Sequence, residues 1–359
     1  MATIPAPLAR SVERLRHQLY RLHLRLAPAP ASMVELILAS WVSQAIQAAA
    51  QLRVADALAA GPLPLDDLAR RVGADPDALG RLLRALIGRG IFRQNRDGRY
   101  ELNSLAETLR ADAPESMAAA ARYYGSRQHR EHWSMLVDSI RTGQASVPRL
   151  RGKEFFDYLD DEPELALLFN ETMTSISLLS EQSVVAAYHF GRGATVVDVG
   201  GGHGRLLASI LAATPDARGV LYDLPPVVAD APALLERAGV ADRVHIDAGS
   251  FFEKVPAGGD FYVLKHIVHD WPDEQAGDIL RNVGSAAGSD ARILLVELVI
   301  PEHHRDFLGK WGDLEMLLCG NGRERTKDEY RDLLRRSGLE MTRVLQTASP
   351  YSLVEAKIA

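Results

Sequence analysis

The feature that most constrains the fold of this chain is a glycine-rich turn between two short apolar runs. The first run, Val196–Val199, leads directly into Gly200–Gly204, and after a helical stretch the second run, Gly219–Tyr222, ends at the carboxylate of Asp223. Glycines let a backbone approach a ligand closely because they lack a Cβ atom. An acid roughly 20 residues beyond such a turn can bind both hydroxyls of a ribose. The pattern therefore predicts an α/β sheet that binds an adenosine-containing ligand.

The spacing of the glycines distinguishes between adenosine cofactors. A dinucleotide-binding turn needs a third glycine three places after the second, and Arg205 occupies that place after Gly202. The turn instead resembles the nucleotide loop of class I S-adenosylmethionine-dependent methyltransferases, whose ligand has no pyrophosphate to accommodate. A nicotinamide-dependent enzyme and a glycine-rich turn that binds nothing are the alternatives.

The C-terminal part of the sequence alternates between strand-like and helix-like segments. Strands are expected near residues 194–199, 218–222, 243–247, 260–264 and 291–297, and helices over 205–213, 226–238 and 274–287. Two further strand-like runs, 341–346 and 352–357, look like an antiparallel edge. This order predicts an α/β fold with a doubly wound, mostly parallel, Rossmann-like sheet. Ligands of such sheets bind beyond the carboxyl ends of the strands, where five polar residues fall: Asp198, Asp223, Ser250, His266 and Glu297.

The first 52 residues predict a helical arm and a second, apolar helix. Leucine and valine recur every three or four residues from Leu8 to Leu26 with arginines between them, which favours an amphipathic docking or dimer arm. A targeting segment and a loosely ordered tail are the alternatives. Prolines in Ala27–Ala31 should break the helix. The segment Ser32–Leu52 is apolar on nearly all sides, which predicts a helix that is buried, within the subunit or between subunits.

Two helices and a hairpin follow, in the order of a winged helix. Asp75 before a proline is typical of a helix N-cap, and the segments 91–94 and 99–102 alternate around a turn at 95–98. The second helix carries three arginines: Arg81, Arg84 and Arg89. The net charge of −6 opposes nonspecific binding to phosphates. A packing module is therefore favoured over a DNA-binding one.

Length and cysteine content limit the remaining possibilities. The 359 residues predict two domains, 1–110 and 111–359, the second with a helical roof at 111–190. Cys319 is the only cysteine, which excludes an internal disulfide and a cysteine zinc site and suits the reducing cytoplasm. Polar residues interrupt the longest apolar run, so we expect no membrane span: Glu35, Ser40, Ser43 and Gln44.

Aromatic and methionine side chains are frequent in the helical segment 111–190. They include Tyr123, Tyr124, Trp133, Phe155, Phe156, Phe169 and Met173. Such residues usually belong to a core. Directly before a cofactor domain, some of them can also roof a pocket for a flat apolar substrate.

Two histidines follow the predicted strand 260–264. Without cysteines or acids at ligand spacing, His266 and His269 make a weak metal site, so we expect no metal. A general base is the sharper hypothesis, because His269 lies where a strand end meets the next helix. A histidine with a structural role is the alternative.

Several segments together resemble the plant-type small-molecule O-methyltransferases, whose bacterial relatives act on polyketides, phenazines and similar secondary metabolites. The resemblance lies in Leu264–Trp271, Val296–Pro301 and Gly322–Thr326. Residues 155–173 are similar to the family's substrate roof, and Asp313–Leu317 is similar to the stretch before its last signature. The winged-helix-like start resembles its dimerisation domain. The resemblance covers nearly the whole chain beyond residue 32.

The resemblance implies a role for each matching residue. His269 would remove the proton of the acceptor hydroxyl, with Glu297 and Glu324 flanking its imidazole. The cofactor, S-adenosyl-L-methionine, would be held by Gly200, Gly202, Asp223, Leu224, Gly249, Ser250, Phe251, Phe252 and Lys265. Family members often carry an acid where Ser250 stands, and a hydroxyl would accept the same hydrogen bond from adenine. Substrate contacts would come from Phe169, Met173, His266 and Met316.

These observations predict methyl transfer to a phenolic or enolic hydroxyl of a small aromatic secondary metabolite. A phenol and a histidine differ in pKa by about 3.5 units, or roughly 5 kcal/mol for complete deprotonation, whereas an aliphatic alcohol would be far harder. A relative of the same fold that hydroxylates or decarboxylates its substrate is one alternative, and a winged-helix transcriptional regulator is another. We expect a cytoplasmic homodimer, formed through the N-terminal domain, without nucleic-acid or membrane partners.

Overall fold

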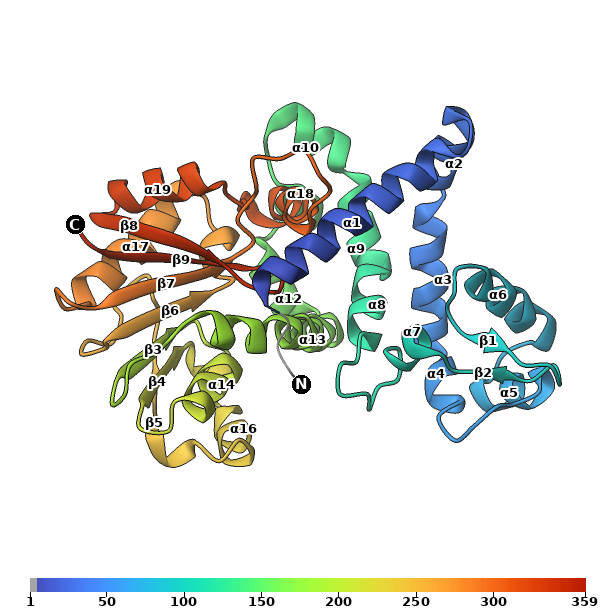
Figure 1. Cartoon of the computed structure of the whole chain (residues 1–359), viewed down its shortest axis with the longest axis horizontal. Helices are drawn as coiled ribbons and strands as arrows, with labels where there is room; N and C mark the ends of the chain where they lie inside the picture. Colours follow the sequence, from blue (N-terminus) through green and yellow to red (C-terminus); the bar gives the residue numbers. More distant parts are fainter. Residues whose placement is uncertain (1–4) are drawn as a thin grey trace. The chain divides into compact units, whose positions relative to one another are not determined.

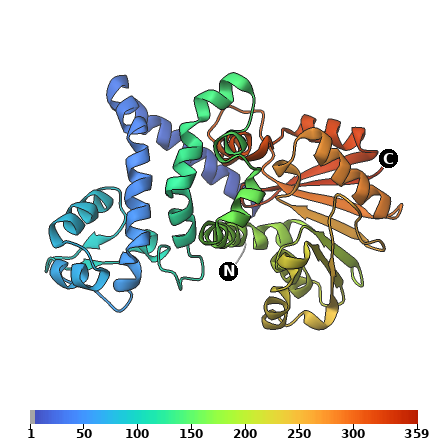
Figure 2. The same ribbon diagram turned by 180° about the vertical axis from the view of Figure 1, so that it is seen from behind.

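The computed structural model describes residues 5–359, which divide into two compact units. One unit comprises residues 18–137 and 150–179, and the other comprises residues 5–17, 138–149 and 180–359. Figures 1 and 2 show the ribbon from opposite sides. The units are interleaved in sequence, so the predicted boundary at residue 110 falls within the first unit and the segment 111–190 contributes to both.

Helices make up most of the chain before residue 190, and strands alternate with helices after it. The helices are α1 (Ala6–Arg25), α2 (Ala29–Ile37), α3 (Ala39–Gln51), α4 (Val54–Ala57), α5 (Leu65–Val72), α6 (Pro76–Gly88), α7 (Ser104–Glu107), α8 (Ala118–Tyr124), α9 (Arg127–Ser134), α10 (Leu136–Thr142), α11 (Ser146–Arg151), α12 (Phe155–Asp161), α13 (Pro163–Ala187), α14 (Arg205–Ala213), α15 (Pro225–Val228), α16 (Ala231–Arg237), α17 (Asp273–Ala286), α18 (Leu308–Gly320) and α19 (Lys327–Arg336), with 3₁₀ turns η1 (Ala241–Arg243) and η2 (Val268–Asp270). The strands are β1 (Arg93–Gln94), β2 (Tyr100–Glu101), β3 (Thr195–Val199), β4 (Arg218–Asp223), β5 (Val244–Ala248), β6 (Phe261–Lys265), β7 (Arg292–Glu297), β8 (Leu339–Gln346) and β9 (Ser352–Ile358).

The second unit is built on a seven-stranded sheet in the order β5-β4-β3-β6-β7-β9-β8. Strands β3 to β7 run parallel, and β9 lies antiparallel between β7 and β8. The predicted doubly wound sheet with an antiparallel C-terminal edge is confirmed. The chain builds outward from β3 to β5 and then returns to place β6 on the other side of β3. A ligand crevice is expected at this reversal, beyond the carboxyl ends of β3 and β6.

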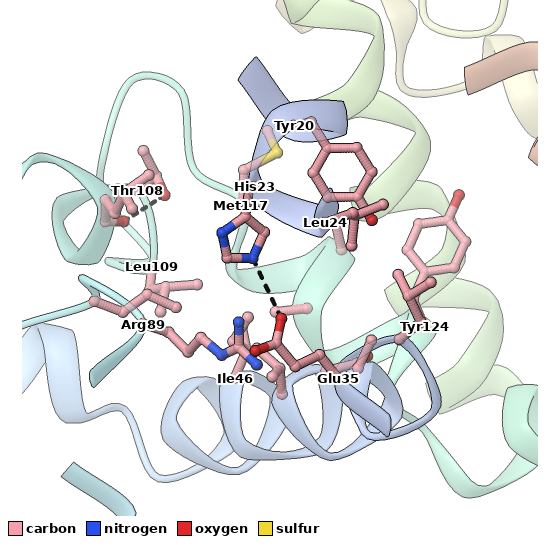
Figure 3. Close-up of a pocket in the computed structure, with 18 residues that line it drawn as sticks. Tyr20, His23, Leu24, Glu35, Ile46, Arg89, Thr108, Leu109, Met117 and Tyr124 are labelled. Carbon is pink, nitrogen blue, oxygen red and sulfur yellow. Dashed lines mark hydrogen bonds and ion pairs between the residues drawn. The ribbon is translucent and has the colours of Figure 1, made fainter. Parts of the chain in front are cut away.

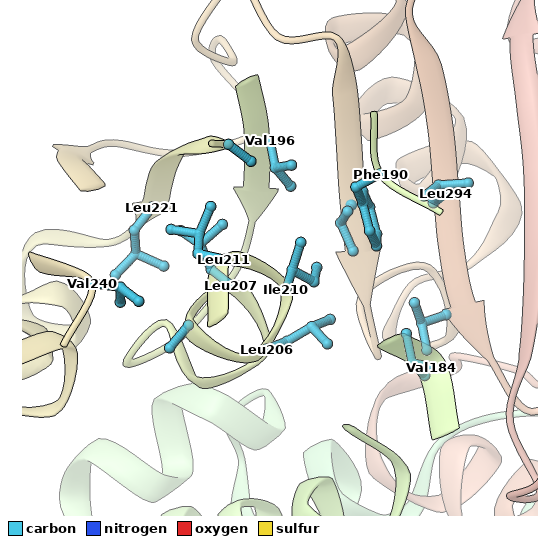
Figure 4. Close-up of a cluster of buried hydrophobic side chains, with 14 of the residues drawn as sticks. Val184, Phe190, Val196, Leu206, Leu207, Ile210, Leu211, Leu221, Val240 and Leu294 are labelled. Atoms are coloured by element: carbon cyan, nitrogen blue, oxygen red, sulfur yellow. The ribbon is translucent and has the colours of Figure 1, made fainter. Parts of the chain in front are cut away.

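Both faces of the sheet are covered by helices, because its central strands are apolar on both sides. Val196 of β3 packs with α14 and α16, whereas its neighbour Val197 packs with α17 and α19. Figure 4 shows the first of these layers, in which Leu207 and Leu211 of α14 lie under Leu221 of β4. Alternate residues of a strand point to opposite faces, so each strand supplies both layers. This two-sided burial fixes the strand ends from which the site residues project.

The helix-and-hairpin part of the first unit agrees with the sequence. The Asp75 carboxylate accepts a hydrogen bond from the Ala78 N–H, and the following helix buries Leu79, Leu83 and Leu86. Strands β1 and β2 pair antiparallel at the predicted hairpin. The N-cap, the apolar stripe and the hairpin are confirmed.

The apolar segment 32–52 was predicted to form one buried helix, and within a single chain it does not. It forms two helices, α2 and α3, with a break at Leu38, and few of its residues are buried. Met33, Ile37 and Trp41 are 56%, 63% and 68% exposed. The expected burial within the subunit is therefore wrong. Among the described residues, Ala29–Gln51 is also one stretch whose length and apolar composition would suffice to span a membrane.

Candidate active site

The glycine-rich turn leaves β3 and passes directly against Ile267, the second residue after the end of β6. Gly200 has φ +68°, and a Cβ atom there would collide with the Cδ1 atom of Ile267. The turn therefore needs glycine both for its conformation and for the close approach. Gly202 also has a positive φ and donates its N–H to Asp223 Oδ2 at 2.8 Å. The predicted glycine turn thus lies at the crevice expected from the topology.

Asp223 ends β4 and faces this turn. Its second carboxylate oxygen accepts the Leu224 N–H at 2.7 Å, and burial raises the pKa of this carboxyl group. Two backbone donors hold the carboxylate in one orientation. The Leu224 side chain itself is half exposed.

A buried carboxylate and a partly buried ammonium group lie near the ends of the adjacent strands β3 and β6. Asp198 is 1% exposed, and within residues 5–359 its Oδ2 atom has no hydrogen-bond partner. Burial raises the pKa of Asp198 to about 7 and lowers the pKa of Lys265 to about 8. A buried acceptor without a partner is costly. These groups fit the ammonium and carboxylate ends of a ligand that carries an amino-acid moiety.

An aromatic wall follows β5. Phe252 lies edge to face with Trp271, with ring centroids 4.7 Å apart, and Phe251 lies 5.0 Å from Phe252. The amide of Asn282 donates to the carbonyls of both phenylalanines. A Cβ atom at Gly249 would lie 2.5 Å from the Tyr222 hydroxyl. The wall is therefore tightly fixed, and Trp271 belongs to it, although it was not among the site residues predicted from the sequence.

Three carboxylates surround the imidazole of His269, which is presented by the short turn η2. Nδ1 lies 2.8 Å from Oε1 of Glu324 and 3.7 Å from Oε2 of Glu297. On the other side of the ring, Nε2 lies 3.3 Å from Asp270 Oδ1. Glu297 also accepts the Val268 N–H at 3.0 Å. The predicted trio of one histidine and two glutamates comes together, and Asp270 is a fourth member.

The carboxylates determine the protonation of this cluster. Burial opposes the charged imidazolium, but the negative charges of Glu324, Glu297 and Asp270 outweigh it, so the pKa of His269 is raised well above its usual value. Burial raises the pKa of Glu297 to about 7 and that of Asp270 to about 6. The cluster therefore holds protons near neutral pH, and it can accept or release one there.

His266 lies between the end of β6 and the His269 cluster, and its backbone conformation is unusual. It adopts a left-handed conformation, with φ +56°, and its ring centroid lies 5.5 Å from that of His269 and 4.5 Å from that of Tyr351. Burial lowers the pKa of His266 well below its usual value, so the ring is neutral. Within residues 5–359 its Nε2 atom is buried without a hydrogen-bond partner.

The other predicted substrate residues are distributed over two helices. Met316 is half-buried on α18, the helix in which a Cβ atom at Gly312 would lie 3.4 Å from Glu324 Oε1. Phe169 and Met173 lie on α13, in the part that belongs to the first unit. There Phe169 packs edge to face against Tyr123 and Phe155, with centroids 5.5 and 5.4 Å apart. The substrate role of these three residues stays a prediction.

Three residues of the site were not predicted as site residues, although each lies in a segment that resembles the O-methyltransferase family. Asp270 and Trp271 directly follow His269, and Arg325 directly follows Glu324. The only indication in the sequence was that they lie next to His269 or Glu324. Spacing alone does not show which atoms such neighbours contact.

Comparison with known proteins decides the family. Residues 133–340 match the O-methyltransferase domain, and residues 34–112 match the O-methyltransferase dimerisation domain. The chain belongs to the O-methyltransferase family. It is an S-adenosylmethionine-dependent enzyme of this class, and the dimerisation match supports the packing-module interpretation of the winged-helix-like segment.

Individual members of the O-methyltransferase family match this chain over nearly its whole length. A phenazine O-methyltransferase from Lysobacter antibioticus is 39% identical over 92% of this chain and 96% of its own length. A mitomycin biosynthesis 6-O-methyltransferase from Streptomyces lavendulae is 37% identical over 93% of this chain and 96% of its own length. A crystal structure of an O-methyltransferase from neocarzinostatin biosynthesis, with S-adenosylmethionine and 2-hydroxy-5-methyl naphthoic acid, has a TM-score of 0.75 at 34% identity and covers 89% of this chain and 96% of that one.

Proposed function

We propose that this enzyme methylates a phenolic or enolic oxygen of a small aromatic metabolite, with His269 as the general base. The observation that carries the proposal is the two-sided setting of the imidazole. Nδ1 is held 2.8 Å from Glu324, so the opposite ring nitrogen, Nε2, which lies 3.3 Å from Asp270 Oδ1, is the one assigned to take a proton from an acceptor. The aromatic acceptors named for the relatives support the substrate class.

The roles of the cofactor residues follow from the chemistry of their side chains. S-adenosylmethionine supplies an electrophilic methyl group on a sulfonium. Gly200 and Gly202 allow its close approach, and Asp223 can exchange its backbone donors for ribose hydroxyls. Asp198 and Lys265 suit the charged amino-acid end. Phe251, Phe252 and Trp271 offer ring faces for adenine.

The carboxylates make His269 a better base for a phenol. An ordinary histidine lies about 3.5 pKa units below a phenol, and Glu324, Glu297 and Asp270 raise the pKa of His269 toward that of the acceptor. Glu324 and Glu297 then stabilise the imidazolium that forms, as an acid does in a serine triad. The remaining task is alignment of oxygen, methyl and sulfur for in-line displacement.

A panel of acceptors of graded acidity tests the proposed chemistry. We expect methyl transfer to phenols and enols such as catechols, hydroxyphenazines and hydroxynaphthoates, and no turnover of matched benzyl alcohols, because an alkoxide is much harder to form. Turnover should persist in EDTA, since the proposed step uses no metal. Equal rates for phenols and benzyl alcohols would contradict the proposal, as would transfer to amines alone.

We also propose that the enzyme works as a homodimer through its N-terminal part. A cavity of about 630 Å³ lies among α1, α2, α3 and α8, and Figure 3 shows the hydrogen bond between His23 and Glu35 in it. Around it α1 to α3 expose many large apolar side chains: Leu19, Leu22, Leu26, Met33, Val34, Leu36, Ile37 and Trp41. Soluble monomers rarely leave such a patch uncovered. The match to a dimerisation domain supports a second copy of this chain as its cover.

A further inference from the structure

Arg325 is a fully buried charged side chain beside the His269 cluster. Its guanidinium is 1% exposed. A buried guanidinium is costly unless its donors are all paired. Each of its five N–H groups has an acceptor here: Val268 O at 2.9 Å, Trp271 O at 3.0 Å, Arg323 O at 3.2 Å, and Asp273 Oδ1 at 2.9 and 3.1 Å.

The carbonyl acceptors bracket the proposed catalytic residues. Val268 and Trp271 lie on either side of His269 and Asp270, and Arg323 directly precedes Glu324. One guanidinium therefore joins the turn that presents the imidazole to the segment that presents its carboxylate partner. One backbone bond reinforces the junction, because the Arg323 N–H donates to His269 O at 2.8 Å, and a second bond, from the Ile300 N–H to Arg325 O at 2.9 Å, ties the Glu324 segment to the residues after β7.

The turn η2 depends on this support. It is one 3₁₀ turn of three residues, too short to hold its own conformation. The segments also approach so closely that a Cβ atom at Gly322 would collide with His269 O. Glycine on one side and a five-donor arginine on the other thus fix the distance between the two segments.

The positive charge of Arg325 is neutralised by Asp273 and not by the carboxylates around the imidazole. Asp273 accepts two of its bonds, and Asp273 Oδ2 accepts a bond from the exposed Arg336 at 2.8 Å. The pKa of His269 is shifted mainly by its burial and by Glu324, Glu297 and Asp270. Arg325 therefore contributes through geometry rather than through its field.

We propose that Arg325 is a positioning residue for methyl transfer, which locks the His269 turn onto the Glu324 segment so that Nδ1 stays paired and Nε2 stays directed at the acceptor. The inference rests on the proposed role of His269 as the base. A lysine cannot replace this function, because an ammonium group has three donors and no planar fork.

Arg325→Lys, Arg325→Ala and the control Arg336→Ala test the proposal. We expect kcat to fall about 10²-fold in Arg325→Lys, the loss that a misplacement of about 1 Å produces, with the affinity for S-adenosylhomocysteine within about twofold of wild type. Guanidinium at non-denaturing concentration should restore part of the kcat of Arg325→Ala. Arg336→Ala, which removes only the outer partner of Asp273, should keep wild-type kcat. Wild-type kcat in Arg325→Lys, or an equal loss in Arg336→Ala, would overturn the proposal.

A double-mutant cycle separates this inference from the proposed function. If Arg325 acts only through His269, the variant His269→Ala/Arg325→Lys should turn over no more slowly than His269→Ala. Additive losses would overturn the positioning role while leaving His269 as the base. Wild-type turnover in His269→Ala alone would instead refute the base itself. If the Arg325 variants are insoluble, Gly322→Ala tests the same junction, and wild-type kcat there would overturn the proposal.

Discussion

At the residue scale, the proposed chemistry depends on one imidazole surrounded by carboxylates. The resemblance to the O-methyltransferase family predicted His269, Glu297 and Glu324 as a group, and one side-chain nitrogen or oxygen atom of each lies within 4.8 Å of the others. Such spacing could also hold a cation, but the 2.8 Å hydrogen bond between Nδ1 and Glu324 already explains it. Asp270 and Arg325 could not be assigned in advance, because their contacts arise from backbone paths that adjacency does not specify.

The pH dependence of Glu324→Gln tests how this imidazole is tuned. The base must be neutral to accept a proton, and Glu324 raises the pKa of His269. Removal of that charge should lower the pKa, so the acidic limb of the kcat profile should move to lower pH. The maximal kcat of the profile should fall by a factor of roughly 10² to 10⁴, because the imidazolium of His269 loses the carboxylate of Glu324. Steady-state rates across the pH range measure both effects, and an unmoved acidic limb would contradict the assignment.

At the scale of elements, the turn between β3 and α14 was the best predicted part of the site. β-branched runs fixed the strands, and the glycine spacing fixed the turn, because both are local properties. The break at Leu38 and the many short helices between residues 104 and 161 were not predicted. Asn103 and Ser126 cap two of these helices, but such local signals do not show how many helices a segment forms, because tertiary packing overrides local propensity.

Gly200→Ala tests this turn. The new Cβ would meet Ile267, and alanine at φ +68° adds backbone strain. We expect the affinity for S-adenosylhomocysteine to fall at least about tenfold, which corresponds to roughly 1.4 kcal/mol, as measured by isothermal titration. Gly191→Ala is the matched control, because a Cβ there has open space. Equal affinity in the two variants would show that the turn does not approach the ligand.

At the scale of the whole molecule, the exposed apolar face of α1 to α3 is the feature that a single chain leaves unexplained. The sequence predicted that the segment 32–52 would be buried, and within one chain it is not. Hydrophobic patterning shows that a face needs cover, but it does not show which chain supplies the cover.

Trp41→Glu tests a dimer formed through this face. Trp41 is 68% exposed on α3, and a carboxylate buried in an apolar interface is strongly unfavourable. We expect the wild-type enzyme to be a dimer by light scattering and the variant to dissociate, with a dissociation constant raised at least about a hundredfold. Ala233→Glu, on the exposed side of α16, should remain dimeric. A monomeric wild-type enzyme would refute the dimer proposal.

The turnover of His269→Ala, measured together with its affinity for S-adenosylmethionine, tests whether His269 is the general base. General bases contribute about 10² to 10⁴ in rate, and the imidazole of His269 is paired with Glu324 and Asp270 rather than with the glycine turn that would bind the cofactor. We expect kcat to fall by that range while the affinity for the cofactor stays within about twofold of wild type. Turnover close to wild type with a phenolic acceptor would contradict this role of His269.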